Sequence, residues 1–292
     1  MISGFRSLHP FPCFLYYIGV MLLAMLLLHP VFLATALFIL AGMNFIYGAR
    51  DRMGRTLITA ILMGAGLFVL NPLFSHRGEH ILFYFLDNPV TLEAIVYGGT
   101  LSLSMLSMLF AFMSYRRVVT NDKFLYLFSS YWPKGTLIVV MALRFIPLLY
   151  TRLHQVSQMQ RSKGISILNG PLKKRIGDGM KLLQVLLTWS LEEALQTADS
   201  MKARGYGLGP RTVYAAYRMR SRDWRFVAVI TAAWLFCAVL WLFGYGRLRI
   251  YPGLEPMRFN VIEWADYIVF ILMVGAPLLL EGKEWIRWRY WK

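Results

Sequence analysis

The sequence predicts an all-α integral membrane protein with about six transmembrane helices and a pair of long amphipathic helices in the cytoplasm. Of its 292 residues, 58% are hydrophobic and 16% are charged. The apolar residues gather into runs that are long enough to cross a bilayer, since a helix rises about 1.5 Å per residue. Two cytoplasmic runs with helical periodicity complete the predicted architecture.

The N-terminal region, residues 1–114, contains four of the predicted spans. The first apolar run, 7–49, holds no Lys, Arg, Asp or Glu, and the pair His29-Pro30 divides it into a helical hairpin. The run is too long for a cleaved signal peptide, so we expect a retained anchor. The third and fourth spans are predicted at 57–73 and 92–114.

The C-terminal region, residues 226–292, contains two further predicted spans, at 226–244 and 265–280. The two cysteines, Cys13 and Cys237, both fall inside apolar runs, where a free cysteine behaves as a small hydrophobe. The sequence therefore predicts neither a disulfide nor a metal site, and it suggests no cofactor.

Lysine and arginine are distributed unevenly over the loops. Of the 31 basic residues, 14 lie between Arg152 and Arg225. The predicted outer loops hold four, namely Arg77, Arg247, Arg249 and Arg258. Because cytoplasmic loops carry the excess of positive charge, both termini are expected in the cytoplasm of a multi-pass plasma-membrane protein. The net charge of +16 then reflects orientation in a lipid bilayer, and no nucleic-acid partner is expected.

The middle region, 115–225, is too long to be a simple connection and is expected to form a cytoplasmic or interfacial domain. Its first part, 124–150, is apolar but interrupted by Pro133, Lys134, Arg144 and Pro147. This pattern argues against a straight spanning helix and favours a helix in the cytoplasmic interface. A helical hairpin that crosses the membrane twice is the alternative.

Two amphipathic helices are predicted after this segment, separated by the turn-forming stretch "NGPLKKRIGDG". Apolar residues recur along both at steps of three and four. The first stripe consists of Leu149, Leu153, Val156 and Met159, and the second of Met180, Leu183, Leu187, Leu191, Ala194, Ala198 and Met201.

Each amphipathic helix ends in a cation followed by glycine. The first corner consists of Arg161, Ser162, Lys163 and Gly164, and the second of Ala203, Arg204 and Gly205. Glycine can adopt the left-handed conformation that ends a helix, and the helix dipole favours a cation in the last turn. One such match is an ordinary cap, but its repetition favours a site. Two exposed cations suit a partner that offers carboxylates.

These segments resemble a known family. The stretch "SLEEALQTADSMKARGYG" is similar to the signature of the T-component, the transmembrane coupling subunit of prokaryotic energy-coupling factor transporters. "LRFIPLLYTRLHQVSQMQRSKG" resembles the first coupling helix of that family, and "NPLFSHRGEHILF" and "TLEAIVYG" resemble its third-to-fourth span region. The resemblance covers about 71–211. Two features depart from it, the Ser-Lys-Gly of the first corner in place of Ala-Arg-Gly and the extra span at 265–280.

The resemblance implies a function without catalysis by this chain. Two cytoplasmic ATP-binding subunits would each dock on one corner, and the apolar stripes would pack under a small membrane subunit that binds a vitamin or metal ion. ATP-driven movement of the two helices would then tilt that subunit. This chain would transmit force and bind neither ATP nor substrate.

Three alternatives can be weighed from the residues. An ordinary ABC permease is the principal one. An autonomous carrier would need polar or broken helices at the bilayer midplane, and these spans offer little of either. An intramembrane enzyme would need acids, His or Cys clustered at one depth, and the sequence suggests no such cluster. It also has no Walker-type phosphate loop, so another chain is expected to supply the energy.

Overall fold

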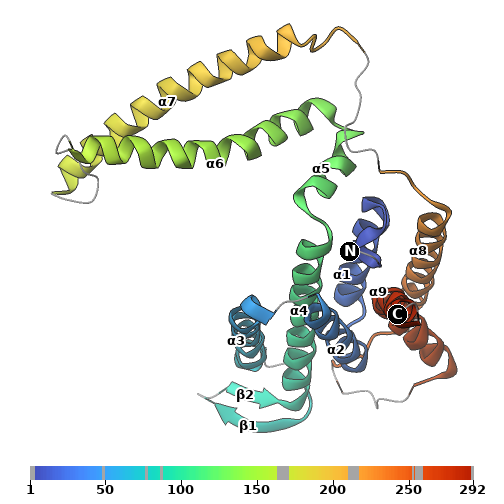
Figure 1. The fold of residues 1–292 in the computed structure, drawn as a ribbon. Coiled ribbons are helices and arrows are strands. Elements are labelled where there is room, and N and C mark those ends of the chain that lie inside the picture. The colour runs from blue at the N-terminus through green and yellow to red at the C-terminus, as the bar shows by residue number, and fades with distance from the viewer. Residues whose placement is uncertain are drawn as a thin grey trace. The chain divides into compact units, whose positions relative to one another are not determined.

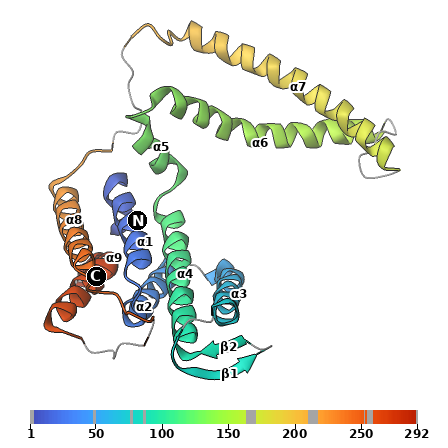
Figure 2. The ribbon, with the colours of Figure 1, turned by 180° about the vertical axis from the view of Figure 1, so that it is seen from behind.

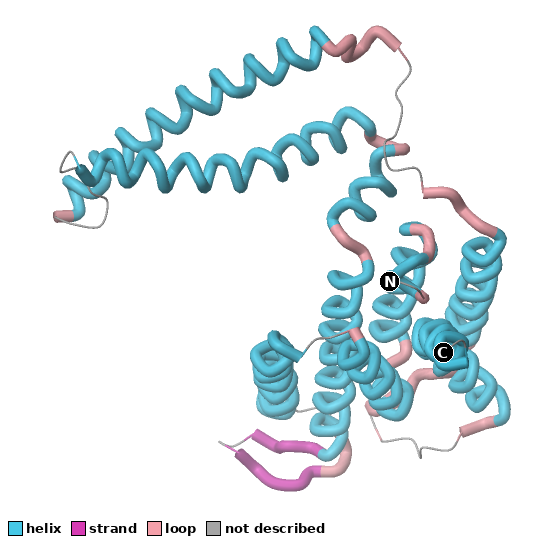
Figure 3. Tube along the Cα trace, viewed as in Figure 1, coloured by secondary structure: helices cyan, strands magenta, loops and turns pink. Residues whose placement is uncertain are grey.

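The described residues of the computed structural model form nine α-helices, a short 3₁₀ helix and one β-hairpin (Figure 1, Figure 3). The structure describes residues 4–47, 50–75, 78–85, 88–162, 171–209, 217–251, 253 and 259–290. Two compact units make up the chain. The first comprises Met1–Phe124 and Tyr217–Lys292, and the second comprises Leu125–Ala216.

The first unit is a helical bundle that begins with the 3₁₀ turn η1. Its helices are α1 (Pro10–Leu26), α2 (Pro30–Ile46), α3 (Arg50–Phe74), α4 (Leu92–Val118), α8 (Ser221–Leu242) and α9 (Val261–Tyr290), preceded by η1 (Phe5–Ser7). The second unit contains the helix pair, α6 (Pro133–Ser162) and α7 (Leu172–Ala203), while α5 (Asn121–Ser129) crosses the boundary between the units. All nine helices can be followed from behind in Figure 2.

The break predicted at His29-Pro30 is confirmed. α1 and α2 each begin with a proline, which has no N–H to lose in the first turn and whose fixed φ suits a helix. The imidazole Nδ1 of His9 accepts the N–H of Phe11 at 3.3 Å, and that of His29 accepts the N–H of Val31 at 3.3 Å. Two histidines therefore cap the two helices of the predicted hairpin.

Each predicted span coincides with a helix, although the span 226–244 extends two residues beyond the end of α8, and the all-α membrane class is confirmed. By length and composition, four helices among the described residues can cross a bilayer, namely α4, α6, α8 and the Val261–Gly282 part of α9. α1, α2 and the Ile58–Phe74 part of α3 are apolar but shorter.

A β-hairpin is the one element outside the all-α prediction. β1 (Ile81–Phe85) and β2 (Asn88–Thr91) pair antiparallel, with Phe83 opposite Val90. β2 leads directly into α4, where the side chain of Thr91 accepts the N–H of Ala94 at 3.3 Å. The buried carboxylate of Glu93 accepts the N–H of His80 at 3.2 Å and so ties the hairpin to the start of α4.

Serine hydroxyls join α4 to the three preceding helices. Helices in lipid gain no hydrophobic free energy when they pack against each other, so small residues and interhelical hydrogen bonds hold them together. The four bonds run from Ser102 Oγ to Gly64 O (2.9 Å), from Ser104 Oγ to Ala24 O (2.6 Å), from Ser107 Oγ to Leu33 O (3.2 Å) and between Ser114 Oγ and Tyr17 Oη (2.6 Å). α4 is thus the central helix of the bundle.

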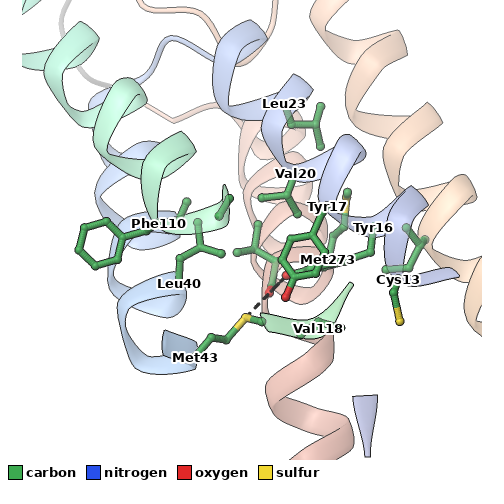
Figure 4. Packing of buried hydrophobic residues seen from close by; sticks show 14 of the residues in the cluster. Cys13, Tyr16, Tyr17, Val20, Leu23, Leu40, Met43, Phe110, Val118 and Met273 are labelled. Carbon is green, nitrogen blue, oxygen red and sulfur yellow. Dashed lines mark hydrogen bonds between the residues drawn. The ribbon is translucent and has the colours of Figure 1, made fainter. Parts of the chain in front are cut away.

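Aromatic and aliphatic side chains of α1, α2, α4 and α9 fill the core, which Figure 4 shows from close by. The hydroxyl of Tyr16 points toward the sulfur of Met43 and donates to the carbonyl of Val274 at 2.7 Å. That carbonyl lies three residues before Pro277, which has no N–H and interrupts the hydrogen bonding of α9. Tyr16 therefore binds α9 in the turn that precedes Pro277.

The middle segment differs from the prediction in where its helices begin and end. The apolar part forms two helices, α5 and α6, and α6 continues without a break through Pro147 to Ser162. The predicted amphipathic stripe 149–159 therefore belongs to a helix that begins earlier, at Pro133. α5 has nine residues and is too short to be one arm of a hairpin that crosses the membrane twice. Pro147 removes one N–H, and it is exposed, so the unpaired carbonyl of Leu143 can be solvated instead.

The chain leaves the bundle and returns to it at the same end. Arg6 at the N-terminus and Arg117 at the end of α4 both donate to the carbonyl of Tyr47, at 3.3 and 3.1 Å. Lys123 on the departing chain donates to Arg6 O at 2.7 Å, and Arg222 on the returning chain donates to the hydroxyl of Ser7 at 3.0 Å. If α6 crossed the membrane, α7 would have to cross back, and α7 is not among the apolar candidate spans of the described chain.

Ser104→Ala removes the hydroxyl that bonds α4 to α1. We expect the free energy of unfolding to fall by about 1 kcal/mol, since interhelical hydrogen bonds in membrane proteins contribute about 0.6 kcal/mol on average and about 1.7 at most. Ser107→Leu should cost about 1–3 kcal/mol, because the added volume must enter a fully buried contact with α2. Denaturant unfolding in detergent measures both.

The matched control is Thr35→Val, because the hydroxyl of Thr35 donates within its own helix, to Val31 O at 3.0 Å and Phe32 O at 2.9 Å. Its free energy of unfolding should change by less than that of Ser104→Ala. Equal losses of unfolding free energy in the two variants would contradict a stabilising role for the bond between α4 and α1.

Cysteine labelling tests the orientation. In a background with Cys13 and Cys237 replaced by alanine, we expect Lys173→Cys to react with a membrane-impermeant maleimide in inside-out vesicles alone. Glu79→Cys should react in intact cells. Both side chains are exposed in the structure. Reaction of Lys173→Cys from outside would contradict a cytoplasmic helix pair.

Candidate functional site

The helix pair carries both predicted corners and both predicted stripes, so it is the candidate site. A short segment, 163–170, joins α6 to α7, and the end of α6 lies beside the start of α7 in both views (Figure 1, Figure 2). Phe145 of α6 stacks on Trp189 of α7. The number of residues from Phe145 to the end of α6 equals the number from the start of α7 to Trp189. The two helices therefore pack antiparallel.

Trp189 is the most specific contact between the two helices. Its ring centroid lies 5.7 Å from that of Phe145 with the planes 6° apart, and the guanidinium carbon of Arg152 lies 5.1 Å from the Trp189 centroid. Phe145 and Arg152 are seven residues apart on α6, about 10.5 Å along its axis. This spacing lets the indole fit between them, with an aromatic stack on one side and a cation–π contact on the other.

α7 packs on α6 through a stripe that lies beside the one predicted to meet a membrane subunit. Leu182 is buried, and Leu186 and Trp189 are partly buried, at steps of four and three. The predicted stripe lies beside this seam and is largely exposed. The exposed fractions of Leu183, Leu187 and Leu191 are 49%, 61% and 70%. In the described part of the chain, α7 therefore has a wide apolar surface of which α6 covers one edge.

An apolar groove of about 380 Å³ lies between α6 and α7. It is lined by Ile146, Leu149, Tyr150, Leu153, Leu183, Leu186, Leu187 and Ser190. Four predicted residues, Leu149, Leu153, Leu183 and Leu187, are thus brought together from both helices. The other predicted residues do not line the groove. Of these, Val156 and Met201 are partly buried, and Met159, Met180, Leu191, Ala194 and Ala198 are exposed.

The second corner has the geometry predicted for a glycine cap. α7 ends at Ala203, Arg204 is the capping residue, and Gly205 has a φ of +81°. The N–H of Gly205 donates to Lys202 O at 2.9 Å, and the N–H of Tyr206 donates to Met201 O at 3.0 Å. This pair of bonds is a Schellman motif, which satisfies the last carbonyls of the helix. Arg204 is left exposed at the negative end of the helix dipole.

The first corner is described in part. Arg161 and Ser162 are exposed at the end of α6, whereas Lys163 and Gly164 lie outside the described residues. The hydroxyl of Ser162 donates to Gln158 O at 3.2 Å and to Met159 O at 3.1 Å, which satisfies two carbonyls near the helix end. Because the helices are antiparallel and α7 has 32 residues, the two corners lie at opposite ends of the pair, roughly 48 Å apart.

Sequence reasoning missed Phe145, Arg152 and Trp189. A signal was present, since Leu182, Leu186 and Trp189 also recur at steps of four and three, beside the predicted stripe on α7. Which of two adjacent stripes faces the partner helix cannot be decided by periodicity. Among the described residues, His, Cys, Asp and Glu side chains form no group of three or more that could hold a metal ion.

Comparison with known proteins assigns the family. The transmembrane protein EcfT of the energy-coupling factor transporter from Lacticaseibacillus paracasei is 34% identical over 89 residues, covering 30% of this chain and 34% of the relative. The EcfT protein of Bacillus subtilis is 31% identical over 103 residues, or 34% of this chain and 39% of the relative. That of Leuconostoc gelidum is 32% identical over 111 residues, or 37% and 41%.

The chain thus matches between about a third and two fifths of the length of these relatives. The model of the CbiQ family, described as cobalt transport protein, matches a far longer stretch, residues 6–215. It covers α1 to α7 and ends before α8. Since well over half of its sequence matches this family model, the chain belongs to the CbiQ family.

Proposed function

We propose that this chain is the transmembrane scaffold subunit of an energy-coupling-factor importer. Two cytoplasmic ATP-binding subunits would dock on the two corners, and a small substrate-binding membrane subunit would pack against the apolar stripes. ATP hydrolysis by the docked subunits would move the helix pair and so reorient the substrate-binding subunit. The chain itself would catalyse no reaction and hold no cofactor.

The observation that carries this proposal is the placement of the two basic corners at opposite ends of an antiparallel helix pair. A separation of roughly 48 Å is too large for a single small binding groove, but it suits two separate copies of one partner. Each corner offers a cation at a helix end, where one charge-assisted hydrogen bond to a carboxylate can form. Two identical ATPase subunits would present two such acidic grooves.

The exposed apolar surface supports the second partner. Leu183, Leu187 and Leu191 are half exposed or more on α7, and the groove beside them is lined mainly by leucine and isoleucine. Such a contiguous apolar surface marks a protein or membrane contact. A membrane subunit with apolar helices would bury it without leaving polar groups unpaired.

The transported substrate is proposed from the names of similar proteins. The family model is described as a cobalt transport protein, and the relatives carry the name energy-coupling factor transporter. We infer that the complex takes up a metal ion or a vitamin, and that the substrate-binding subunit selects it. Co-purification from the native membrane followed by identification of the small membrane subunit is the experiment that tests the whole assignment.

That preparation is expected to contain, besides lipid, this chain, two ATPase subunits and the small membrane subunit. Reconstituted ATP-driven uptake should require all of them. Uptake with this chain and the ATPases alone would indicate an ordinary ABC permease. Uptake with this chain alone would contradict every form of the proposal.

Arg204→Glu tests the second corner. It places a like charge against the carboxylates expected in the ATPase groove, and reversal of a buried charge contact costs several kcal/mol. We expect pull-down of the ATPase and ATP-driven uptake to be abolished while the chain stays folded. Arg204→Ala should be milder, and Lys163→Ala milder still, because lysine makes a point contact that Arg161 can partly replace.

Lys181→Glu is the control, because it makes the same charge reversal on α7 at a position far from Arg204. It breaks the ion pair between the exposed Lys181 ammonium and the buried Asp178 carboxylate, at 3.7 Å, which should have little effect on pull-down through the second corner. Full ATPase binding and uptake by Arg204→Glu would mean that the second corner is a helix cap and no more.

Trp189→Leu tests the contact that fixes how α6 and α7 cross. With spin labels at positions 134 and 202, near the ends of α6 and α7 that are not joined, the wild type should give a narrow distance distribution. Trp189→Leu loses the stack and the cation–π contact, each worth about 0.5–1.5 kcal/mol, and should broaden it. Trp189→Phe keeps an aromatic ring and should change it less. An unchanged distribution in Trp189→Leu would contradict the assigned role.

A further inference from the structure

The N-terminal turn, residues 4–9, contacts both points at which the chain passes between the bundle and the second unit. The bundle ends at Phe124 on the departing side and resumes at Tyr217 on the returning side. These two points are separated by the whole helix pair in sequence, yet residues of one short turn bind each of them. All the contacts below lie within the bundle unit.

On the departing side, the turn binds α5. Lys123 Nζ donates to the backbone carbonyl of Arg6 at 2.7 Å, and the ring of Phe124 lies 6.2 Å from that of Phe14 on α1. Burial lowers the pKa of the Lys123 ammonium, and the charge of Arg6 acts in the same direction. Lys123 is partly buried against the bundle, and so is its bond to the turn.

On the returning side, the same turn binds the segment that leads into α8. Arg222 donates to the hydroxyl of Ser7 at 3.0 Å. The imidazole of His9 lies 6.1 Å from the ring of Tyr217, edge to face. The carboxylate of Asp223 accepts the N–H of Arg220 at 3.0 Å, so the start of α8 is itself fixed.

The turn is firmly seated in the bundle. Phe5 is fully buried and packs against Tyr16, Tyr17 and Phe226, with ring centroids 5.3, 6.0 and 5.7 Å apart. The side chain of Arg6 lies over the ring of Tyr47 at 4.7 Å and donates to its carbonyl. An element held by α1, α2 and α8 together moves with the bundle rather than with the chain connections.

We propose that the N-terminal turn is a clasp that fixes both connections of the helix pair to the bundle, so that movement of the pair is transmitted to the bundle and not absorbed by the connections. This inference rests on the proposed coupling function. Arg6, Ser7 and His9 act as positioning residues, because they touch neither ATPase nor substrate. Loosening the clasp should leave ATPase docking intact and reduce transport per ATP.

The test uses the complete reconstituted complex and measures uptake and ATP hydrolysis in the same vesicles. Lys123→Met removes the bond on the departing side, Ser7→Ala removes the bond on the returning side, and the double variant removes both. A hydrogen bond of ordinary strength corresponds to about a fivefold change in an equilibrium. We therefore expect uptake per ATP to fall up to about fivefold in each single variant and further in the double variant.

The controls separate coupling from folding. ATPase pull-down, hydrolysis rate and thermal unfolding should stay within about twofold or a few degrees of the wild type. Lys123→Arg and Ser7→Thr keep the hydrogen-bond donor or acceptor and should retain coupling. Arg116→Met removes an exposed cation at the same end of α4 and should leave uptake per ATP unchanged.

Three outcomes are decisive. A fall in uptake per ATP with intact docking and stability supports the clasp. An unchanged ratio in the double variant overturns it, and so does a parallel loss of docking and thermal stability, which would indicate a structural role alone. If the wild-type chain binds no ATPase, the proposed function fails before the clasp is reached, so the two failures are distinguishable.

Discussion

The bundle depends on one constraint, namely that helices surrounded by lipid gain nothing from burying apolar side chains against one another. α4 meets this constraint with serines that donate to backbone carbonyls of α1, α2 and α3. A serine side chain is short, so its hydroxyl reaches a backbone carbonyl of a neighbouring helix only where the two helices pack closely. These contacts therefore also set the spacing at which Tyr16, Tyr17 and Met43 can fill the core.

α6 and α7 pack against each other in a different way from the helices of the bundle. The two helices share a narrow seam centred on Trp189, and the larger part of their apolar surface is left uncovered in the described chain. A sandwich of Phe145, Trp189 and Arg152 fixes the register of the helices at one point. Elsewhere, few contacts oppose a change in the angle between them. Two helices that share one specific contact and little other packing can change their crossing angle about that contact. The helices of the bundle differ, because several bonds join α4 to its neighbours.

The sequence was sufficient for features set by the length of apolar runs and by backbone conformation. Apolar runs of adequate length located every bundle helix, and Gly205 indicated a left-handed cap because no other residue adopts that φ as readily. Features set by competition between local and tertiary effects were not predictable. Judged from the local sequence, Pro147 should interrupt a helix, yet α6 continues through it at an exposed position. The choice between the stripes of Leu182 and Leu183 depends on a stack with Phe145 that no periodicity encodes.

The length of α7 has a consequence for how such a chain can evolve. Removing or adding one residue turns everything beyond that point by about 100° around the helix axis and shifts it by about 1.5 Å. Arg204 would then face a new direction relative to the apolar stripe of the same helix. An insertion or deletion of about seven residues restores the direction of Arg204 but changes the length of α7 by about 10.5 Å. An insertion or deletion within α7 therefore changes either the direction of Arg204 or its distance from the other end of the helix. If the two corners bind two ATPase subunits as proposed, relatives should keep this helix at constant length.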